Sequence, residues 1–340
     1  MFKIKPPGIR ATKAGNTELR DRGNTGLRDR GNTDLSAPRR LKRIGRKSMN
    51  IIADGWKDFE LIDCGDGMKL ERWGDVILAR PDPQAIWKKQ TPEAWKDAQA
   101  VYHRSRSGGG SWEYKKTLPG RWTVSYGGLK FYVEPTGFKH TGLFPEQAAN
   151  WDHMSALIEK RRAAGGSVRV LNLFGYTGAA SAACAASGAS VCHVDASKGM
   201  VTRARENMEL SGLADRPVRY LVDDAFKFVA RERRRGSRYE GIIMDPPSYG
   251  RGPGGEVWKL EDNIYAFLEE CAELLSDEGL FFILNSYTTG FSPVVTENML
   301  KILIAGRRGG TVTAGDLCLR CSGSGILLPC GATARWERTS

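Results

Sequence analysis

The chain has 340 residues, of which 41% are hydrophobic and 26% are charged, a composition typical of globular proteins and a length that suits about two domains. Its longest run without a charged residue, 170–194, is interrupted by serines and glycines, which excludes a membrane-spanning helix. Seven scattered cysteines, an odd number, predict a reducing, cytoplasmic location rather than a secreted disulfide framework.

The net charge of +12 comes from one end of the chain. Residues 1–48 contain 14 Lys and Arg against 4 Asp and Glu, whereas the rest of the chain contains 37 against 35. An eight-residue repeat with one leucine per copy begins at Gly15, Gly23 and Gly31. Because so little apolar surface cannot offset the entropy of ordering, we predict that 1–48 is a disordered basic tail. The alternatives are a targeting segment and a dispensable tail before a native start near Met49.

Residues 49–146 predict a small β-rich domain. Glycine turns separate short strand candidates, and Gly127-Gly128 predicts a tight hairpin turn. These strands are expected at 59–63, 68–72, 75–79, 122–126 and 129–133. Residues 103–120 are expected to form a basic, glycine-containing loop. Seven of the nine tryptophans lie between Trp56 and Trp151, which favours an aromatic core over a platform that stacks unpaired bases.

From residue 147 to 340, short apolar runs alternate with helical patterns, which predicts a doubly wound, mostly parallel α/β sheet of the Rossmann-like type. Strands are expected at 168–174, 190–195, 218–222, 241–245 and 280–285. Helices are expected at 147–163, 178–187, 198–211, 224–234, 261–275 and 293–304. An antiparallel pair near 316–320 and 333–337 would complete the edge of the sheet.

Three strand ends predict a site for a nucleoside cofactor, because open α/β sheets bind ligands beyond the carboxyl ends of their strands. The first strand runs into the turn Phe174-Gly-Tyr-Thr-Gly178, where glycines would let the backbone turn sharply and approach a ligand. Asp195 ends the second strand and is placed to accept hydrogen bonds from ribose hydroxyls. Asp224, Ala225 and Phe226 follow the third strand, where a carboxylate can accept from an adenine amine. The glycine spacing differs from the Gly-x-Gly-x-x-Gly pattern of dinucleotide sites, which disfavours an oxidoreductase.

The fourth strand ends in Asp245-Pro246-Pro247-Ser248-Tyr249. The two prolines remove N–H donors and stiffen the turn, leaving a carboxylate and carbonyls to accept from a planar amine, while Tyr249 can stack on its ring. We expect Asp245, Pro246, Pro247 and Tyr249 to form the reaction centre. The glycine-rich 250–255 that follows is either a lid over a flipped base or a connection without a role.

These motifs resemble those of the class I S-adenosylmethionine-dependent methyltransferases, in particular the bacterial large-subunit (23S) rRNA methyltransferases that make 5-methylcytosine or 7-methylguanine. The resemblance covers about 122–290 and includes the segment Thr141–Gln147, which is expected to close over the cofactor. It implies that S-adenosylmethionine is held by residues of that segment, the glycine turn and the two following strand ends. These are Gln147, Phe174, Gly175, Tyr176, Thr177, Gly178, Asp195, Ser197, Asp224 and Ala225.

The chain departs from the cytosine-C5 members of that family, whose catalytic cysteine follows the fifth strand. Here that position carries Asn285-Ser286-Tyr287, and position 248 is serine. Because a ring carbon needs covalent activation by a thiolate whereas a nitrogen has its own lone pair, nitrogen is the favoured acceptor. Cys318, Cys321 and Cys330 lack a fourth zinc ligand, so we expect buried thiols and no metal.

The leading hypothesis is therefore a methyltransferase that acts on a nucleobase nitrogen in RNA, with rRNA as its partner and no membrane association. Two alternatives stay open. One is a methyltransferase acting on a protein or a small molecule, which the nearly neutral charge of the chain beyond residue 48 favours. The other is a non-catalytic protein that binds RNA through the basic tail.

Overall fold

The computed structural model describes residues 49–339, apart from 106–108, 138, 252–256 and 289. The predictions for the repeat tail 1–48 and for most of the glycine-rich 250–255 lie outside the described residues. Among the described helices, none is long and apolar enough to cross a membrane.

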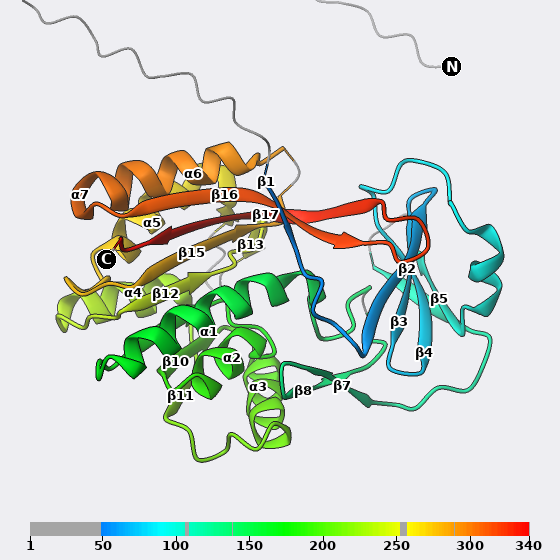
Figure 1. Cartoon of the computed structure of the whole chain (residues 1–340), viewed down its shortest axis with the longest axis horizontal. Helices are drawn as coiled ribbons and strands as arrows, with labels where there is room; N and C mark the ends of the chain where they lie inside the picture. Colours follow the sequence, from blue (N-terminus) through cyan, green and yellow to red (C-terminus); the bar gives the residue numbers. More distant parts are fainter. Residues whose placement is uncertain (1–48, 106–108, 138, 252–256, 289, 340) are drawn as a thin grey trace, which may run out of the picture. The chain divides into compact units, whose positions relative to one another are not determined.

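The main sheet has eight strands in the order β1-β16-β17-β15-β12-β9-β10-β11 (Figure 1). Strands β9 to β12 and β15 are parallel, and β17 is antiparallel to both β15 and β16. The central strands are buried along almost their whole length, as expected for parallel strands that are covered on both faces. The predicted Rossmann-like α/β fold is confirmed. The strand bounds are β1 (Met49–Ile52), β9 (Arg169–Leu173), β10 (Ser190–Asp195), β11 (Val218–Val222), β12 (Gly241–Met244), β15 (Phe281–Ser286), β16 (Thr311–Arg320) and β17 (Leu327–Glu337).

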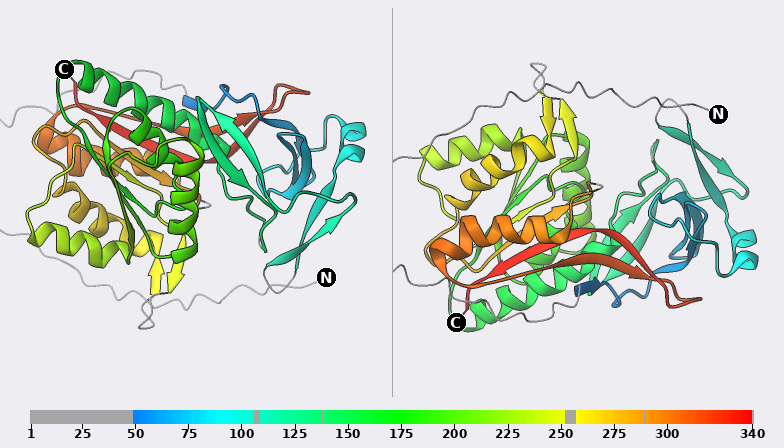
Figure 2. Two further views of the ribbon diagram at one scale, coloured as in Figure 1. Left: turned by 90° about the horizontal axis from the view of Figure 1, so that it is seen from below. Right: turned by 90° about the horizontal axis from the view of Figure 1, so that it is seen from above.

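Helices cover both faces of this sheet (Figure 2). Alternate residues of one strand enter different cores: Val170 packs in the core that includes residues of α1, α2 and α3, whereas Leu171 packs in the core that includes residues of α4, α5 and α6. The bounds are α1 (Ala148–Ala163), α2 (Ala179–Ala186), α3 (Lys198–Leu210), α4 (Ala225–Arg234), α5 (Leu260–Ala272) and α6 (Pro293–Leu300), which continues through a π turn (Lys301–Ala305) into α7 (Gly306–Arg308).

Residues 59–114 form a separate five-stranded sheet in the order β2-β3-β4-β5-β6, and the predicted hairpin follows it. The predicted loop 103–120 is wrong in part, because Gly110–Tyr114 pairs antiparallel with the preceding strand. The tryptophans do build a core here, with Trp73 and Trp151 buried in the same cluster. The bounds are β2 (Phe59–Gly65), β3 (Met68–Trp73), β4 (Val76–Pro81), β5 (Ala100–Arg104), β6 (Gly110–Tyr114), β7 (Trp122–Tyr126) and β8 (Leu129–Val133), with a 3₁₀ turn at Pro92–Asp97.

The first described strand, β1, does not join the sheet that follows it in the chain. It pairs parallel with β16 and forms the edge of the main sheet. We had expected the C-terminal hairpin β16–β17 to form this edge, but β1 covers it. The far end of this hairpin meets β2, where the Sγ atoms of Cys64 and Cys321 are 3.3 Å apart. Cys318 and Cys321 are buried, as expected, whereas Cys330 is half-buried.

The close pairing of β1 with β16 requires a glycine at position 315. A Cβ atom at this glycine would lie 1.9 Å from the carbonyl oxygen of Met49. We therefore expect Gly315→Ala to push β1 away from β16 and lower the free energy of unfolding by about 1–3 kcal/mol. Hydrogen exchange at Ile51 and Ile52 should become fast. The matched control is Gly137→Ala, whose Cβ would meet no atom within 4 Å; equal effects of the two changes would contradict this role of Gly315.

Candidate active site

The candidate site lies at the carboxyl ends of β9, β12 and β15. The chain leaves β9 toward β10 on one side and returns to β12 on the other, so this edge is the switch point of the sheet. A cavity here is lined by the glycine turn, by the start of α1 and by the ends of these strands. The lining residues are Leu143, Phe144, Gln147, Asn150, Trp151, Met154, Asn172, Phe174, Gly175, Tyr176, Thr177, Gly178, Ala179, Ala180, Ile243, Asp245 and Asn285.

The glycine turn has an unusual backbone. Phe174, Tyr176 and Gly178 have φ values of 57°, 51° and 83°, and such values are uncommon for the two aromatic residues. Both glycines line the cavity, and neither position has room for a side chain. A Cβ at Gly175 would lie 2.4 Å from the ring of His193, and one at Gly178 would lie 2.7 Å from the Cβ of Ala204. Both glycines thus let the turn pack closely on β10 and α3.

Asp195 supports this turn from the end of β10. Its Oδ2 accepts a hydrogen bond of 2.9 Å from the backbone N–H of Tyr176, and its Oδ1 accepts one of 2.8 Å from that of Ser197. Burial raises the pKa of Asp195, and these two hydrogen bonds oppose that rise. Each oxygen keeps a further lone pair, so the carboxylate is oriented and can still accept from a hydroxyl pair. Ser197 begins α3 and caps it by accepting from Met200 N–H.

The end of β11 presents Asp224 and Ala225 at the start of α4. Asp224 is the helix cap and accepts a hydrogen bond of 2.9 Å from Lys227 N–H. The ring centroids of Phe226 and Phe267 are 4.2 Å apart. Asp195, Ser197, Asp224 and Ala225 follow two neighbouring strands at this edge of the sheet, but none of the four lines the cavity.

Three side chains hold the segment Thr141–Gln147 and the residues just before it. Thr177 Oγ1 donates to the carbonyl of Gly142 over 2.7 Å, and Trp56 Nε1 donates to the carbonyl of Pro145 over 2.9 Å. Arg80 of β4 donates to the carbonyl of Lys139 over 2.6 Å. The segment is therefore fixed from the glycine turn and from the N-terminal part of the chain. Its Phe144 ring lies 5.4 Å from that of Tyr176.

Buried polar groups that the sequence analysis had not assigned to the site surround Gln147. Gln147 Nε2 donates to the hydroxyl of Tyr287, which donates in turn to Glu146 Oε1, both over 2.9 Å. Asn150 Nδ2 donates to Gln147 Oε1 over 2.8 Å and to Asn285 Oδ1 over 3.0 Å. Two features of the sequence indicate them. Asn150 lies three residues beyond Gln147 on a helix, and Asn285 and Tyr287 lie at the end of the fifth strand, where the C5 enzymes carry their cysteine.

Asp245 lines the cavity at the end of β12. Removal from water raises the pKa of its carboxyl to about 7, and the nearby charge of Glu146 contributes to that rise. Pro246 is buried, and the carbonyl of Pro247 accepts a hydrogen bond of 2.6 Å from Trp258 Nε1. Tyr249 is 50% exposed and pairs with Lys259 in the short ribbon β13 (Tyr249–Arg251) and β14 (Val257–Lys259). Of the predicted reaction centre, Asp245 alone lines the cavity.

The lining suits a nucleoside that carries a cationic centre. Phe144, Phe174 and Tyr176 supply aromatic faces, which attract cations and stack on planar rings, and Asp245 supplies a carboxyl group. Amides of Gln147, Asn150 and Asn285 supply donors and acceptors on the same wall. An aromatic wall with one carboxyl group is chemically suited to a sulfonium cofactor.

Comparison with known proteins decides the family. A model of the S-adenosylmethionine-dependent methyltransferases matches residues 85–298. The chain belongs to this family. A crystal structure of an S-adenosylmethionine-dependent methyltransferase from Agrobacterium tumefaciens is 39% identical, with a TM-score of 0.81, over 86% of this chain and 94% of that one. The predictions of a methyltransferase and of S-adenosylmethionine as its cofactor are confirmed.

More distant relatives are similar over parts of their length. Ribosomal RNA large subunit methyltransferase K of Neisseria meningitidis is 26% identical over 65% of this chain and 64% of that protein. Ribosomal RNA large subunit methyltransferase I of Klebsiella pneumoniae is 34% identical over 36% of this chain and 29% of that protein. The chain thus matches less than two thirds of either relative. A solved Streptococcus mutans structure, 18% identical with a TM-score of 0.63, shares the fold over 83% of this chain and 76% of that one.

Asp195→Asn tests the role of this carboxylate. The amide keeps the shape, but it removes the charge and one acceptor, so the turn loses a supporting hydrogen bond and a cofactor hydroxyl loses its partner. We expect the affinity for S-adenosylmethionine, measured by calorimetry, to fall about tenfold or more, which corresponds to the ~1.5–3 kcal/mol of a hydrogen bond to a charged group. The control is Asp215→Asn in an exposed loop. Unchanged affinity of the Asp195 variant would contradict the assignment.

Proposed function

We propose that this methyltransferase modifies a nitrogen atom of a nucleobase in large-subunit rRNA. The observation that carries the proposal is the position of Asp245, whose carboxyl lies in the cofactor cavity and has a pKa of about 7. A carboxylate with this pKa is suited to accept the proton that an N–H group loses when it is methylated. The names of the Neisseria and Klebsiella relatives support RNA as the substrate.

The absence of a thiol supports nitrogen over C5 as the acceptor. None of the described residues that line the cavity is a cysteine, and the end of the fifth strand, near which the C5 enzymes carry their nucleophile, reads Asn285-Ser286-Tyr287. Burial and the nearby charges of Glu146 and Asp245 raise the pKa of Tyr287 well above its usual value, so its hydroxyl stays protonated. A phenol that donates to Glu146 can orient groups, but it is not a nucleophile.

The bound cofactor supplies an electrophilic methyl group, and the chain supplies position and proton acceptance. We assign the ribose hydroxyls to Asp195 with Ser197, the adenine to Asp224 and Ala225, and the remainder to Gln147 and to the turn Phe174-Gly175-Tyr176-Thr177-Gly178. Asp245 orients the target amine through its carboxylate and then accepts its proton. Pro246 and Pro247 keep this turn rigid because their rings fix φ, and we assign to Tyr249, half exposed beside it, the stacking on the target base.

A second candidate is methylation of a protein or a small molecule. The chain beyond residue 48 has 37 basic against 35 acidic residues, whereas proteins that bind long RNA are usually strongly basic. This observation favours a substrate with less negative charge than rRNA. Transfer of a labelled methyl group should therefore be measured with both RNA and protein fractions as substrates.

The decisive experiment transfers a labelled methyl group from S-adenosylmethionine to unmodified large-subunit rRNA, followed by mass spectrometry of the nucleosides. We expect one N-methylated nucleoside, and no product with Asp245→Asn, which keeps the size of the side chain but cannot accept the proton. Label in 5-methylcytosine, or in protein rather than in RNA, would overturn the proposal.

The pH dependence of the reaction follows from the pKa of Asp245. Its carboxyl is ionised, and able to accept a proton, only above a pH of about 7, so turnover should fall about tenfold for each pH unit below that value. The charge of Glu146 contributes to this elevated pKa, so Glu146→Gln should lower it. Turnover of this variant should then persist to lower pH than that of the wild type.

The control for the pH profile is Glu209→Gln on the exposed side of α3. It removes one carboxylate without touching the network of Tyr287 and Gln147. Its turnover should fall over the same acidic pH range as that of the wild type. An acidic limb of Glu146→Gln at the wild-type pH would show that Glu146 has only a structural role.

A further inference from the structure

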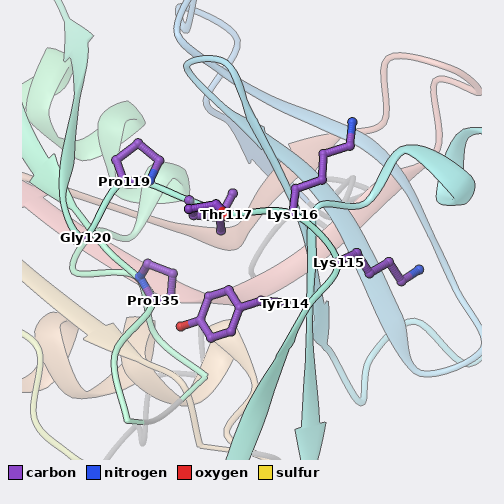
Figure 3. Close-up of a pocket in the computed structure, with 8 residues that line it drawn as sticks. Tyr114, Lys115, Lys116, Thr117, Pro119, Gly120 and Pro135 are labelled. Carbon is purple, nitrogen blue, oxygen red and sulfur yellow. The ribbon is translucent and has the colours of Figure 1, made fainter.

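A second hollow lies outside the cofactor site, where β6 ends and the chain crosses to β7. It encloses about 470 Å³ and is lined by Tyr114, Lys115, Lys116, Thr117, Leu118, Pro119, Gly120 and Pro135 (Figure 3). No carboxylate is among these residues. We call these eight residues the β6 groove. Nothing in the cofactor site or in the reaction described above uses them.

The groove presents an exposed aromatic ring at the end of an edge strand. β6 is the outermost strand of its five-stranded sheet, and Tyr114, its last residue, is 55% exposed. Figure 3 shows Tyr114 beside Pro135, with the side chains of Lys115 and Lys116 extending away from both. The exposed ring of Tyr114 leaves apolar surface in contact with water. A flat partner that stacks on the ring would cover this surface.

The charge of the groove is positive. Lys115 and Lys116 are exposed, and within the described part of the chain no carboxylate forms an ion pair with either. Their backbone N–H groups both donate to the carbonyl of Gln99, which fixes the direction in which the side chains leave the strand.

The groove is continuous with the segment that leads to the active site. Trp112 of β6 donates to the carbonyl of Thr136 over 2.8 Å, next to Pro135 in the groove wall. From there the chain runs through His140, whose ring lies 5.4 Å from that of Phe144 in the cofactor cavity. The ten residues from Pro135 to Phe144 span at most about 30 Å even when fully extended. A ligand in the groove is thus within a few nucleotides of the reaction centre.

We propose that the β6 groove binds single-stranded RNA next to the methylated nucleotide, with a base against Tyr114 and backbone phosphates at Lys115 and Lys116. This proposal rests on the proposed rRNA function and adds the surface that holds the substrate. Unpaired bases stack on aromatic side chains whatever their sequence, and lysines neutralise the adjacent phosphates. An acidic polypeptide would use the lysines but would have no planar group for the tyrosine.

The test measures binding of a short single-stranded oligouridine to the full-length chain by fluorescence anisotropy. Tyr114→Ala should weaken binding about tenfold, since stacking of a base on an aromatic ring contributes about that factor or more. The double variant Lys115→Ala, Lys116→Ala should reduce the slope of log affinity against log salt by about 1.4, because each phosphate contact contributes about 0.7. Residues 1–48 are present in every variant, so their contribution cancels in the comparison.

The matched controls are Tyr265→Ala, an exposed tyrosine on α5, and the double variant Lys57→Ala, Lys160→Ala at two other exposed lysines. Binding by the groove variants equal to that of their controls would overturn the proposal. So would competition by polyglutamate as strong as that by RNA of equal charge, which would identify an acidic polypeptide as the occupant. Affinity for S-adenosylmethionine should be unchanged in all variants, and this confirms that they fold.

Turnover separates this proposal from the one on which it rests. With rRNA as substrate, the groove variants should raise KM while leaving kcat unchanged, because the groove holds RNA and does not touch the reacting atoms. Methylation of rRNA by the wild type, with KM unchanged in the groove variants, would overturn the groove alone. Tight oligouridine binding through Tyr114 without any methylation of rRNA would overturn the proposed function instead.

Discussion

The hydrogen bond from Thr177 to the carbonyl of Gly142 is the contact on which the geometry of the site depends. It joins the glycine turn after β9 to the segment Thr141–Gln147, which is 35 residues away in the chain. The turn itself is held by Asp195 through the backbone of Tyr176. One face of the cavity is thereby tied to the other by polar contacts, and neither the turn nor the segment can move without breaking a buried hydrogen bond.

The residues just before this segment are held through a buried ion pair. Arg80 donates to the carbonyl of Lys139 and forms two hydrogen bonds, of 2.6 and 2.9 Å, with the buried carboxylate of Glu71. Burial alone would raise the pKa of Glu71, but the charges of Arg80 and Lys69 hold it at about 2. A buried pair of this kind adds little net stability, yet removing one partner costs about 3–5 kcal/mol because the other is left unpaired. The pair therefore contributes most by fixing where Arg80 can donate.

This arrangement lets the N-terminal part of the chain position residues of the cavity without lining it. Arg80 and Trp56, both N-terminal to β5, hold two carbonyls of the stretch that carries Phe144 and Gln147 into the cavity. Glu146 lies on the same stretch, and its charge acts on Asp245. Burial is the main cause of the raised pKa of Asp245, and Glu146 adds to it. Hydrogen bonds from outside the Rossmann-like sheet help to position Glu146 and so affect this second contribution.

The sequence predicted those site residues whose position depends only on the strand that they end. The five parallel strands, β9 to β12 and β15, were predicted to within two residues, because buried parallel strands are continuous apolar runs, and Asp195 and Asp245 followed from them. The short strands β13 and β14 were not predicted. β6 was missed because Gly109 beside it and Gly110 at its start were taken as signs of a loop. Pairing of β1 with β16, more than 260 residues apart, leaves no local signal at all.

The network of Glu146, Asn150, Asn285 and Tyr287 was missed for a related reason, since each residue is ordinary within its own segment. What makes Tyr287 informative is the partner it meets: a phenol that donates to a buried carboxylate and accepts from Gln147 cannot be replaced by a thiol without leaving two polar groups unsatisfied. In this chain the hydroxyl of Tyr287 therefore completes the network with Glu146 and Gln147. A residue that is bound in this way orients its neighbours, and in the proposed reaction the carboxyl group of Asp245, not Tyr287, accepts the proton.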